Sequence, residues 1–374
     1  MSIIEYYSLD RILKEDADYN IIIGEKGNGK SYQIKTRRAL GNYLESVSDK
    51  IREILPECFK DGKRFMLIRR LREEISNDQV MNYFKDLNIS KITNGKYSTI
   101  NCYRKKIYFA NLDSDGKVKN GELIGYVVAL STEQNYASNM FLDVSDMIFE
   151  EFMSRTLYLK NEVTKLMNLY ATVDRKRHTT KLWLVGNTVT RVNPYVNEWG
   201  LHDILSKMHP GDLKTVEIKT SDDDVVKIAI EFCKPTGVSS HVIGSSGSMI
   251  NEGKWETRPQ PHLPKSKNDY KIEFRFIFKY QNFKFICELL SDLKTHNIAY
   301  FIYPYEGEID NKTLVITDEI NISPLYQRNI YDLSINNDRL KMILSTTFRE
   351  QNIFYSDDLT GTDFKQVVDF VIRR

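Results

Sequence analysis

The chain lacks several features that would place it in a specialised class of protein. Its 374 residues include only four cysteines and nine prolines, and no apolar run reaches the length of about 18 residues that a membrane-spanning helix needs. The cysteines are widely scattered, without metal-ligand spacing or a disulfide framework, which favours reduced thiols in a cytosolic protein. The first residues carry charges and no apolar core, so we expect no signal peptide.

An excess of charge of one sign is also missing. The chain has 53 basic and 51 acidic residues, which gives a net charge of +2. Proteins that hold nucleic acid tightly are usually strongly basic, because each phosphate contact adds affinity. Near-neutral charge therefore argues against a sequence-specific DNA binder. It is compatible with a machine that must release a polyanion in every cycle.

What the sequence does contain is a complete phosphate-binding loop. Residues Gly24–Ser31 match the pattern G-x-x-x-x-G-K-S. The loop follows a short apolar segment, 19–23, which we expect to be a buried strand, and precedes a helix expected from about 30 to 48. In such loops the backbone N–H groups and the helix N-terminus face phosphates, the lysine reaches the β- and γ-phosphates, and the serine binds Mg²⁺. The residues predicted to bind ATP here are Gly24, Gly27, Asn28, Gly29, Lys30, Ser31 and Tyr32, with Lys30 also catalytic and Ser31 also a metal ligand.

A second motif consists of two carboxylates after an apolar segment. Glu150 and Glu151 follow Met147-Ile148-Phe149, and the carboxyl end of a buried strand is where nucleotides bind. In ATPases the first carboxylate of such a pair holds Mg²⁺ and the second orients and polarises the attacking water. The common form has aspartate first, so Glu150 adds a methylene that a shifted strand or a bridging water must absorb. The alternative is two carboxylates on a solvated loop.

A glutamate that activates water distinguishes ATP hydrolases from other classes of protein with a phosphate loop. Small GTPases position water with a glutamine and carry a guanine-reading Asn-Lys-x-Asp motif, which this chain lacks. Nucleotide kinases need no water-activating glutamate. We therefore predict ATP hydrolysis, with Glu151 as the base, and hydrolysis in such folds usually drives movement.

Two further polar positions are candidates for the same site. Asn187 ends the apolar segment 181–185 and Gly186, so it is a candidate sensor of the γ-phosphate; a simple turn asparagine is the alternative. The charged run Asp174–His178 precedes that strand, and such runs are usually solvated surface. The sharper interpretation is an arginine finger, donated to the γ-phosphate of a neighbouring subunit.

The pattern of elements predicts an α/β protein followed by a smaller α+β domain. Strand–helix alternation up to residue 233 indicates a sheet with helices on both faces. Prolines and a Gly-Ser run mark 234–267 as a linker, and period-two alternation at 272–280 begins a domain at 268–374. We expect strands at 64–69, 105–111, 121–130, 146–149, 181–185, 216–219, 225–232, 283–287, 299–303 and 314–317, and helices at 78–87, 163–174, 339–350 and 363–373.

Together these passages resemble the phi29-like encapsidation proteins, the DNA-packaging ATPases of small tailed phages. The resemblance spans roughly residues 7–200, and the C-terminal region is similar only in layout. It implies a RecA-like ASCE P-loop ATPase domain at 1–233 and a degenerate ribonuclease-H-like domain at 268–374. The matching passages are Ile23–Tyr32, Ile68-Arg69-Arg70, Phe149–Phe152, Thr172–Arg177, Gly186-Asn187 and Val192–Tyr195.

The resemblance also implies a function and partners. It implies a homomeric ring of five subunits on the portal vertex of an empty capsid, in the host cytoplasm, where ATP hydrolysis drives double-stranded DNA inward. A structural packaging RNA bridges motor and capsid in the best-known members, so such an RNA is a candidate partner. Arg175 falls at the position of the family's trans-acting arginine finger, with Arg177 in reserve. Arg72 matches a basic residue acting between subunits, whereas Ala137 stands where the family has another such lysine.

Further predictions concern possible DNA contacts and the C-terminal domain. Arg155 and Lys160 follow the two glutamates on a loop expected to face the ring centre, so they are candidates for contact with the DNA backbone; solvated surface is the alternative. In the C-terminal domain a docking role is favoured over nuclease activity, because the available carboxylates form no recognisable pattern. Two other functions stay open, a helicase-like or recombination ATPase and a non-catalytic ATP-binding scaffold. The C-terminal carboxylates considered are Glu273, Glu288, Asp318 and Asp369.

Overall fold

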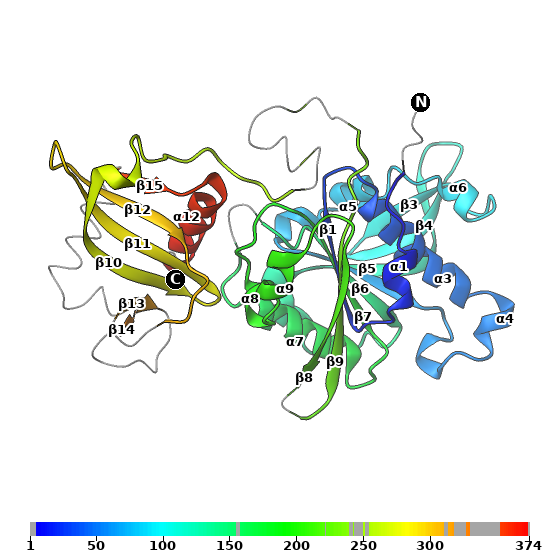
Figure 1. The fold of residues 1–374 in the computed structure, drawn as a ribbon. Helices are drawn as coiled ribbons and strands as arrows, with labels where there is room; N and C mark the ends of the chain where they lie inside the picture. Colours follow the sequence, from blue (N-terminus) through cyan, green and yellow to red (C-terminus); the bar gives the residue numbers. More distant parts are fainter. Residues whose placement is uncertain are drawn as a thin grey trace. The chain divides into compact units, whose positions relative to one another are not determined.

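The chain divides into two compact units (Figure 1). The first comprises Met1–Val189 and Lys207–Trp255, and the second comprises Thr190–Ser206 and Glu256–Arg374. The segment Thr190–Ser206 was predicted within the first domain, but it groups with the second because Val192 is buried in that unit's core. The structure, a computed structural model, describes residues 5–154, 158–220, 222–238, 242, 250, 254–309, 313–317, 327–329 and 352–372.

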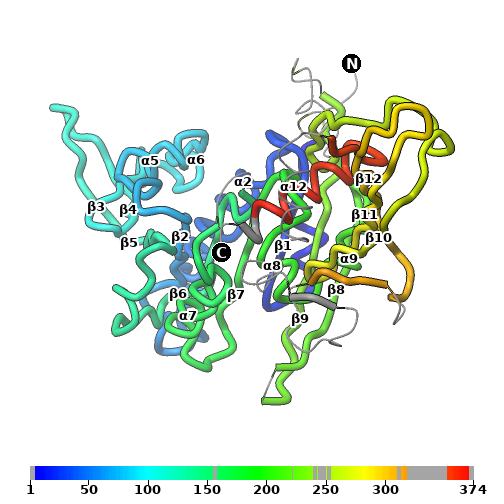
Figure 2. The backbone as a smooth tube through the Cα atoms, turned by 90° about the vertical axis from the view of Figure 1, so that its left-hand side faces the viewer, coloured from blue at the N-terminus to red at the C-terminus, as the bar shows by residue number. Residues whose placement is uncertain are grey.

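The first unit is built on a nine-stranded sheet with the order β3-β4-β5-β2-β6-β7-β1-β9-β8. Six adjacent strands, from β5 to β9 in that order, run parallel. The strands β3, β4 and β8 add antiparallel pairings at the two edges, and Figure 2 shows β3 and β4 beside α5 and α6. The strands are β1 (Tyr19–Gly24), β2 (Arg64–Arg69), β3 (Thr99–Tyr103), β4 (Lys106–Leu112), β5 (Val118–Ala129), β6 (Val144–Glu150), β7 (Lys181–Asn187), β8 (Leu213–Lys219) and β9 (Val225–Phe232).

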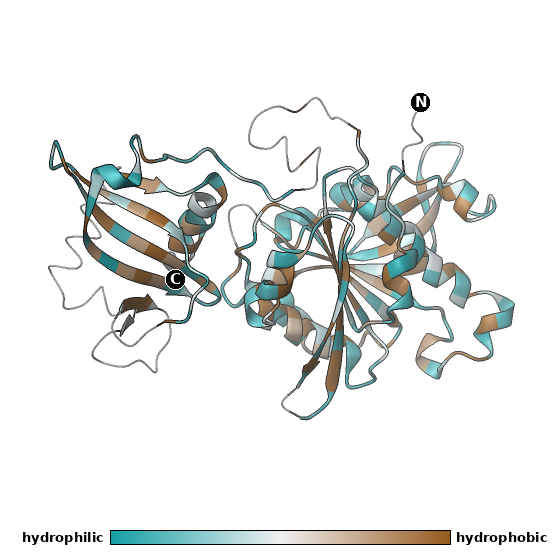
Figure 3. Ribbon diagram, in the orientation of Figure 1, coloured by the Kyte–Doolittle hydropathy of each residue, from teal (hydrophilic) through white to brown (hydrophobic). Residues whose placement is uncertain are grey.

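The central strands are buried on both faces, as their continuous apolar sequences predict. Ile21, Ile22 and Ile23 of β1 are fully buried, and the strands are visibly apolar in Figure 3. The predicted strands 64–69 and 225–232 are confirmed at those bounds, and the other strands predicted in this unit differ at their ends. Strand β3 was not predicted, because only Ile100 and Cys102 in it are buried, which is a short alternation.

The helix after the phosphate loop contains a π-helical segment. The whole helix runs through α2 (Lys30–Gln33), the π-helix η1 (Ile34–Ala39) and α3 (Leu40–Ser46). The single helix predicted here is therefore continuous, but its α-helical hydrogen bonding is interrupted at η1. A Cβ at Gly41 would lie 2.7 Å from the Thr36 carbonyl oxygen, so only glycine fits. The other helices of this unit are α1 (Asp10–Lys14), α4 (Asp49–Arg52), η2 (Glu57–Phe59), η3 (Arg72–Ile75), α5 (Asn77–Tyr83), α6 (Ile89–Ile92), η4 (Leu130–Tyr136) and α7 (Glu162–Asp174).

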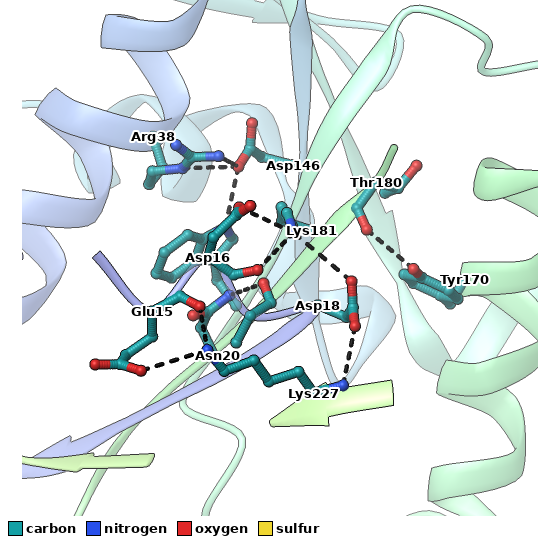
Figure 4. Close-up of polar contacts among 12 residues, drawn as sticks. Glu15, Asp16, Asp18, Asn20, Arg38, Asp146, Tyr170, Thr180, Lys181 and Lys227 are labelled. Atoms are coloured by element: carbon teal, nitrogen blue, oxygen red, sulfur yellow. Dashed lines mark hydrogen bonds and ion pairs between the residues drawn. The ribbon is translucent and has the colours of Figure 1, made fainter. Parts of the chain in front are cut away.

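A polar network ties together the amino ends of the central strands (Figure 4). Asp146 of β6 is fully buried, and it accepts hydrogen bonds from Arg38 Nε and Trp183 Nε1, each at 2.9 Å. Lys181 of β7 lies 3.2 Å from Asp16 and 3.6 Å from Asp18. These contacts satisfy the buried charge at the amino ends of the strands. The phosphate loop lies at the opposite, carboxyl ends of the strands.

The second unit contains a six-stranded sheet with the order β14-β13-β10-β11-β12-β15. The antiparallel strands β10 to β12 form its centre, and Phe364 of α12 packs with Phe285 in the core. The predicted strand 314–317 is confirmed, α12 begins five residues before the predicted 363, and the predicted helix 339–350 lies outside the described residues. The elements are α8 (Pro194–Glu198), α9 (His202–Lys207), η5 (Lys267–Asp269), β10 (Tyr270–Tyr280), β11 (Phe283–Asp292), β12 (Ile298–Pro304), β13 (Leu314–Thr317), β14 (Gln327–Asn329), β15 (Ile353–Tyr355) and α12 (Asp358–Ile372).

None of the helices within the described ranges has both the length and the apolar character that crossing a bilayer requires.

Candidate nucleotide site

A cavity of about 580 Å³ lies at the carboxyl edge of the first unit's sheet. This volume falls within the usual range of small-molecule pockets. The ends of β1, β6 and β7 meet here because parallel strands end at the same edge of a sheet. The cavity is lined by Tyr6, Tyr7, Lys26, Gly27, Asn28, Gly29, Lys30, Ser31, Tyr32, Gln33, Asp86, Glu150, Glu151, Val185, Gly186 and Asn187.

The loop between β1 and α2 has the backbone shape that its glycines allow. Gly27 and Gly29 adopt φ angles of 86° and 98°, in the left-handed region that glycine reaches without strain. Gly29 precedes the first helical residue, Lys30, so the helix N-terminus opens directly into the cavity. The helix dipole and the N–H groups of the first turn favour an anion such as phosphate at this point.

The Lys30 ammonium lies between the loop and the end of β7. Its Nζ donates to the Glu25 carbonyl at 2.6 Å, to Asn28 Oδ1 at 3.1 Å and to Asn187 Oδ1 at 3.3 Å. Burial lowers the pKa of Lys30, because the charged ammonium is disfavoured away from water. The predicted sensor Asn187 and the predicted phosphate-binding lysine are thus direct neighbours.

Glu150 and Ser31 form the part of the cavity that suits a divalent cation. Ser31 Oγ donates to Glu150 Oε2 at 3.0 Å, and Tyr83 Oη donates to Glu150 Oε1 at 2.6 Å. Burial raises the pKa of Glu150, and the two hydroxyl donors oppose this rise. A hydroxyl and a carboxylate side by side are the hard oxygen ligands that Mg²⁺ takes together with water and phosphate oxygens, so the residues present fit this metal.

Glu151 begins the loop after β6 and lines the same cavity. Its φ angle is 56°, which is unusual for a residue with a side chain, and its carboxylate is exposed. Arg69 Nη2, at the end of β2, donates to Glu151 Oε2 at 3.1 Å. Such unusual backbone conformations concentrate at functional sites, where the surrounding structure holds them in place.

Arg70 provides that support. Its Nη1 donates to the Glu151 carbonyl at 3.2 Å, and its Nε donates to Glu162 Oε2 at 2.9 Å. Arg70 and Glu162 are 8% and 2% exposed, so this is a buried ion pair. It joins the end of β2 to the start of α7 across the loop that carries Glu151.

We expect Arg70→Ala to lower the free energy of unfolding by about 3–5 kcal/mol, because it removes one partner of a buried ion pair and leaves Glu162 without its main counter-charge. Arg37→Ala is the matched control, since Arg37 pairs with Asp10 at 3.0 Å on the surface and should cost at most about 1 kcal/mol. Urea unfolding of both variants measures the difference. Equal losses of stability would contradict the role assigned to the buried pair.

Several cavity residues were not predicted from the sequence. Tyr6 and Tyr7 come from the segment before α1, and the Tyr7 N–H donates to the Asn28 carbonyl at 2.9 Å. Gln33 and Asp86 also line the cavity. Tyr6 and Tyr7 carry no motif and lie far before the loop, so only the folded chain reveals them. Gln33 could have been predicted from the sequence, since it lies one helical turn after Gly29.

Other predicted residues lie outside the cavity. Arg175 follows the last residue of α7 as its C-cap, with a φ of 48°, and its exposed side chain donates to the Asn139 carbonyl at 3.0 Å. Arg177 instead donates to the carbonyls of Val173 and Asp174, at 2.8 and 2.9 Å, so its guanidinium serves the end of α7. Lys160 is exposed just before α7, and Arg155 lies outside the described residues.

The parallel sheet, the phosphate loop and the carboxylate-lined cavity define a nucleotide-using α/β protein. Residues 1–233 match the family model of the Podovirus DNA encapsidation protein (Gp16). The chain therefore belongs to the Podovirus DNA encapsidation protein family, and the resemblance predicted from its sequence is confirmed.

Individual relatives agree with this assignment. The chain is 27% identical over 326 residues to the DNA packaging protein of Bacillus phage phi29, covering 84% of each chain. It is 30% identical over 220 residues to the DNA packaging protein of Bacillus phage B103, covering 58% of this chain and 57% of that one. Both relatives are named as DNA packaging proteins, in agreement with the family that the chain belongs to.

Two solved structures share the fold. One, of the bacteriophage Phi-29 viral genome packaging motor assembly, has a TM-score of 0.54 at 21% identity and covers 98% of both chains. The other, of the Phi-28 DNA packaging motor, has a TM-score of 0.51 at 17% identity and covers 99% of this chain and 98% of that one. At these identities the likeness concerns the mixed α/β fold with its two sheets.

Proposed function

We propose that this chain is a subunit of an ATP-driven motor that moves double-stranded viral DNA into a preformed capsid. The observation that carries the proposal is the meeting of Lys30, Ser31, Glu150 and Glu151 around one cavity, in a member of a DNA encapsidation family. Phosphate-binding and water-activating groups are placed together, which is what hydrolysis requires.

Each cavity residue has a role in this proposal. The loop N–H groups and Lys30 bind the phosphates of ATP, Ser31 and Glu150 hold Mg²⁺, and Asn187 senses the γ-phosphate. When bound, Mg²⁺ neutralises charge that develops on the phosphoryl oxygens. Glu151, which lines the cavity, orients the attacking water and accepts its proton, for which its carboxylate must release Arg69.

The order of strands supports an ASCE, RecA-like ATPase domain. Strand β7 lies between β1, which precedes the loop, and β6, which ends at Glu150 just before Glu151. The insertion of β7 places Asn187 beside Lys30, 3.3 Å from its Nζ. Lys30, Asn187 and Glu150 therefore lie at the ends of three adjacent strands, β1, β7 and β6, as one shared phosphate site requires.

We further propose that the catalytic site is completed by a neighbouring subunit in a ring of five. Arg175 is exposed and does not line the cavity of its own subunit. To serve another subunit's site, its guanidinium would leave the carbonyls of Thr172 and Asn139, to which it donates at 3.3 and 3.0 Å. Arg177 is the reserve candidate, because its side chain is half-buried and its guanidinium donates to the carbonyls of Val173, Asp174 and Leu142. Arg72 begins η3, two residues beyond Arg70, where it could take over the role of the lysine that Ala137 replaces.

The partners in this proposal are double-stranded DNA, the portal vertex of the capsid and, as in the best-known relatives, a packaging RNA. The protein would act in the host cytoplasm, attached to the procapsid while DNA enters. The second unit serves docking, as a degenerate ribonuclease-H-like domain. No group of three or more His, Cys, Asp or Glu side chains comes together as a metal cluster anywhere in the described part of the chain.

The best-placed carboxylate of the second unit supports this docking role. Glu288 is fully buried and lies 2.7 Å from Lys267 Nζ, and it accepts hydrogen bonds from Arg275 Nε and Tyr303 Oη, each at 2.9 Å. Burial opposes ionisation, but these three donors outweigh it and lower the pKa of Glu288. Glu288 is thus neutralised by the chain itself. Glu273 pairs with Lys271, Asp369 is exposed, and Asp318 lies outside the described residues.

We expect the double substitution Arg155→Ala with Lys160→Ala to weaken DNA-stimulated hydrolysis and packaging while basal ATP hydrolysis is kept. Each lost phosphate contact should also reduce the salt dependence of DNA binding. Lys50→Ala with Lys60→Ala serves as a charge-matched control, because both lysines are exposed and neither lines the cavity. Unchanged packaging and stimulation in the first variant would remove these two residues from the DNA interface.

The motor itself is tested by measuring ATP hydrolysis of the purified protein with and without duplex DNA and empty capsids. We expect hydrolysis to rise with DNA and DNA to enter capsids only with ATP and Mg²⁺. Unwinding of a short duplex without capsids would favour a helicase-like or recombination ATPase instead. Activity retained in Lys30→Ala would favour a scaffold that uses ATP only to set its shape.

A further inference from the structure

The first carboxylate of the motif is held from both sides. Glu150 is 5% exposed, and each of its carboxylate oxygens accepts one hydrogen bond, from Tyr83 at 2.6 Å and from Ser31 at 3.0 Å. Glutamate has one more rotatable bond than the aspartate that usually stands here. The second donor, Tyr83, removes the freedom that this bond adds.

We propose that Tyr83 is a positioning residue that orients Glu150 for magnesium and so allows glutamate to replace aspartate. The proposal rests on the function inferred above, in which Glu150 holds the metal of bound ATP. Tyr83 comes from α5, 67 residues before Glu150 in the chain, and it carries no motif. Its own side chain does not line the cavity, so it acts on the metal through Glu150.

Tyr83 is itself fixed by Lys35. Lys35 is 4% exposed, and its Nζ donates to the Tyr83 carbonyl at 2.8 Å and lies 4.8 Å from the centre of the Tyr83 ring. Lys35 also pairs with Asp86, three residues beyond Tyr83. A cation at the last carbonyls of α5 is favourable for the helix dipole, and the ring contact sets the direction of the tyrosine hydroxyl.

The phosphate-loop helix therefore supports both sides of the carboxylate. Ser31 and Lys35 are four residues apart, which places them on one face of the helix. Ser31 contacts Glu150 directly, and Lys35 contacts it through Tyr83. The loop, the serine and the carboxylate are thus connected by one continuous set of contacts, within the first unit.

Magnesium makes such orientation important. Mg²⁺ demands near-ideal octahedral geometry and gives up its water reluctantly, so a poorly aimed carboxylate binds it weakly. Removing a residue that hydrogen-bonds to a metal ligand typically lowers metal affinity by about 10–100-fold. The effect should appear in metal affinity and leave metal-free nucleotide binding unchanged.

The test is Tyr83→Phe, which removes only the hydroxyl. We expect the Mg²⁺ concentration that half-saturates nucleotide binding to rise about 10-fold or more, with binding of a fluorescent ATP analogue in EDTA unchanged. Mn²⁺ affinity of the ADP complex, followed by electron paramagnetic resonance, should fall by the same factor. Tyr43→Phe is the matched control, since its hydroxyl donates to Glu122 at 2.8 Å outside the cavity.

A double-mutant cycle gives a second measurement. Aspartate at position 150 would end short of the Tyr83 hydroxyl, so in a Glu150→Asp background Tyr83→Phe should add little to the loss of Mn²⁺ affinity. Non-additive effects are the mark of side chains in direct contact. Additive losses, or an unchanged Mn²⁺ affinity in Tyr83→Phe, would overturn the proposal.

Two features keep the result interpretable. Lys35→Met disturbs the support of Tyr83 without touching Glu150 and should weaken Mn²⁺ binding in the same direction, so the idea stays testable if Tyr83→Phe folds poorly. The metal readout also needs neither hydrolysis nor DNA. A chain that binds Mn²⁺–ADP with the predicted dependence on Tyr83 but never packages DNA would refute the motor and keep the positioning role.

Discussion

Replacing Glu151 with glutamine should reduce ATP hydrolysis by about 10²–10⁴-fold, the usual contribution of a positioned general base. Glutamine keeps the size of the side chain and its reach into the cavity but cannot accept a proton from water. The loop, Lys30 and Glu150 are untouched, so ATP and Mg²⁺ should still bind tightly. Steady-state hydrolysis and equilibrium binding of a fluorescent ATP analogue measure the two effects separately.

The contrast with Lys30→Ala makes this prediction specific. Lys30→Ala removes the ammonium that lies within the phosphate loop, so both binding and hydrolysis should be lost. Glu45→Gln, an exposed residue of α3 outside the cavity, is the matched control and should behave as the unmodified protein. Substantial hydrolysis in Glu151→Gln would assign the base to another group.

Arg175→Ala should slow hydrolysis by about 10³–10⁵-fold if the guanidinium completes a neighbour's site. The loss should appear in the turnover number with little change in nucleotide binding, because the finger stabilises charge that develops only in the transition state. Arg175→Lys should recover only part of the activity, since an ammonium lacks the planar fork of the guanidinium. The measurement is steady-state ATP hydrolysis by rings assembled on capsids.

Mixed rings decide whether the arginine acts between subunits. A site with an intact Lys30 in an Arg175→Ala subunit can be completed by a Lys30→Ala neighbour that still carries Arg175. Mixtures of the two inactive variants should therefore regain part of the turnover. The absence of any recovery, at every mixing ratio, would place the arginine's action within its own subunit or remove it from catalysis.

Predictions that depend on neighbours in the sequence agree well with the structure. The loop Gly24–Ser31 needs only a strand before it and a helix after it, and both are present. The strand before Glu150 and the one before Asn187 were predicted from their apolar runs. Position 150 was assigned correctly to the end of a strand even though glutamate replaces aspartate there.

Predictions that depend on pairing between distant segments were weaker. The π-helical segment at Ile34–Ala39 has no local signature, and the strand Thr99–Tyr103 offers too short an alternation to be recognised. The segment Thr190–Ser206 was predicted with the first domain, and it packs in the second unit. A domain boundary depends on which core a segment joins, which composition alone does not show.

The sequence by itself determined that this chain has a phosphate loop, a pair of carboxylates after a buried strand and a resemblance to encapsidation proteins, because each is a local pattern with a local physical cause. Only the tertiary structure decided that β7 lies between β1 and β6, and which distant side chains meet Glu150 and Glu151. Tyr83 and Arg70 reach the site because the chain folds back over the sheet. Such contacts depend on strand order and packing, to which residues far apart in the chain contribute together.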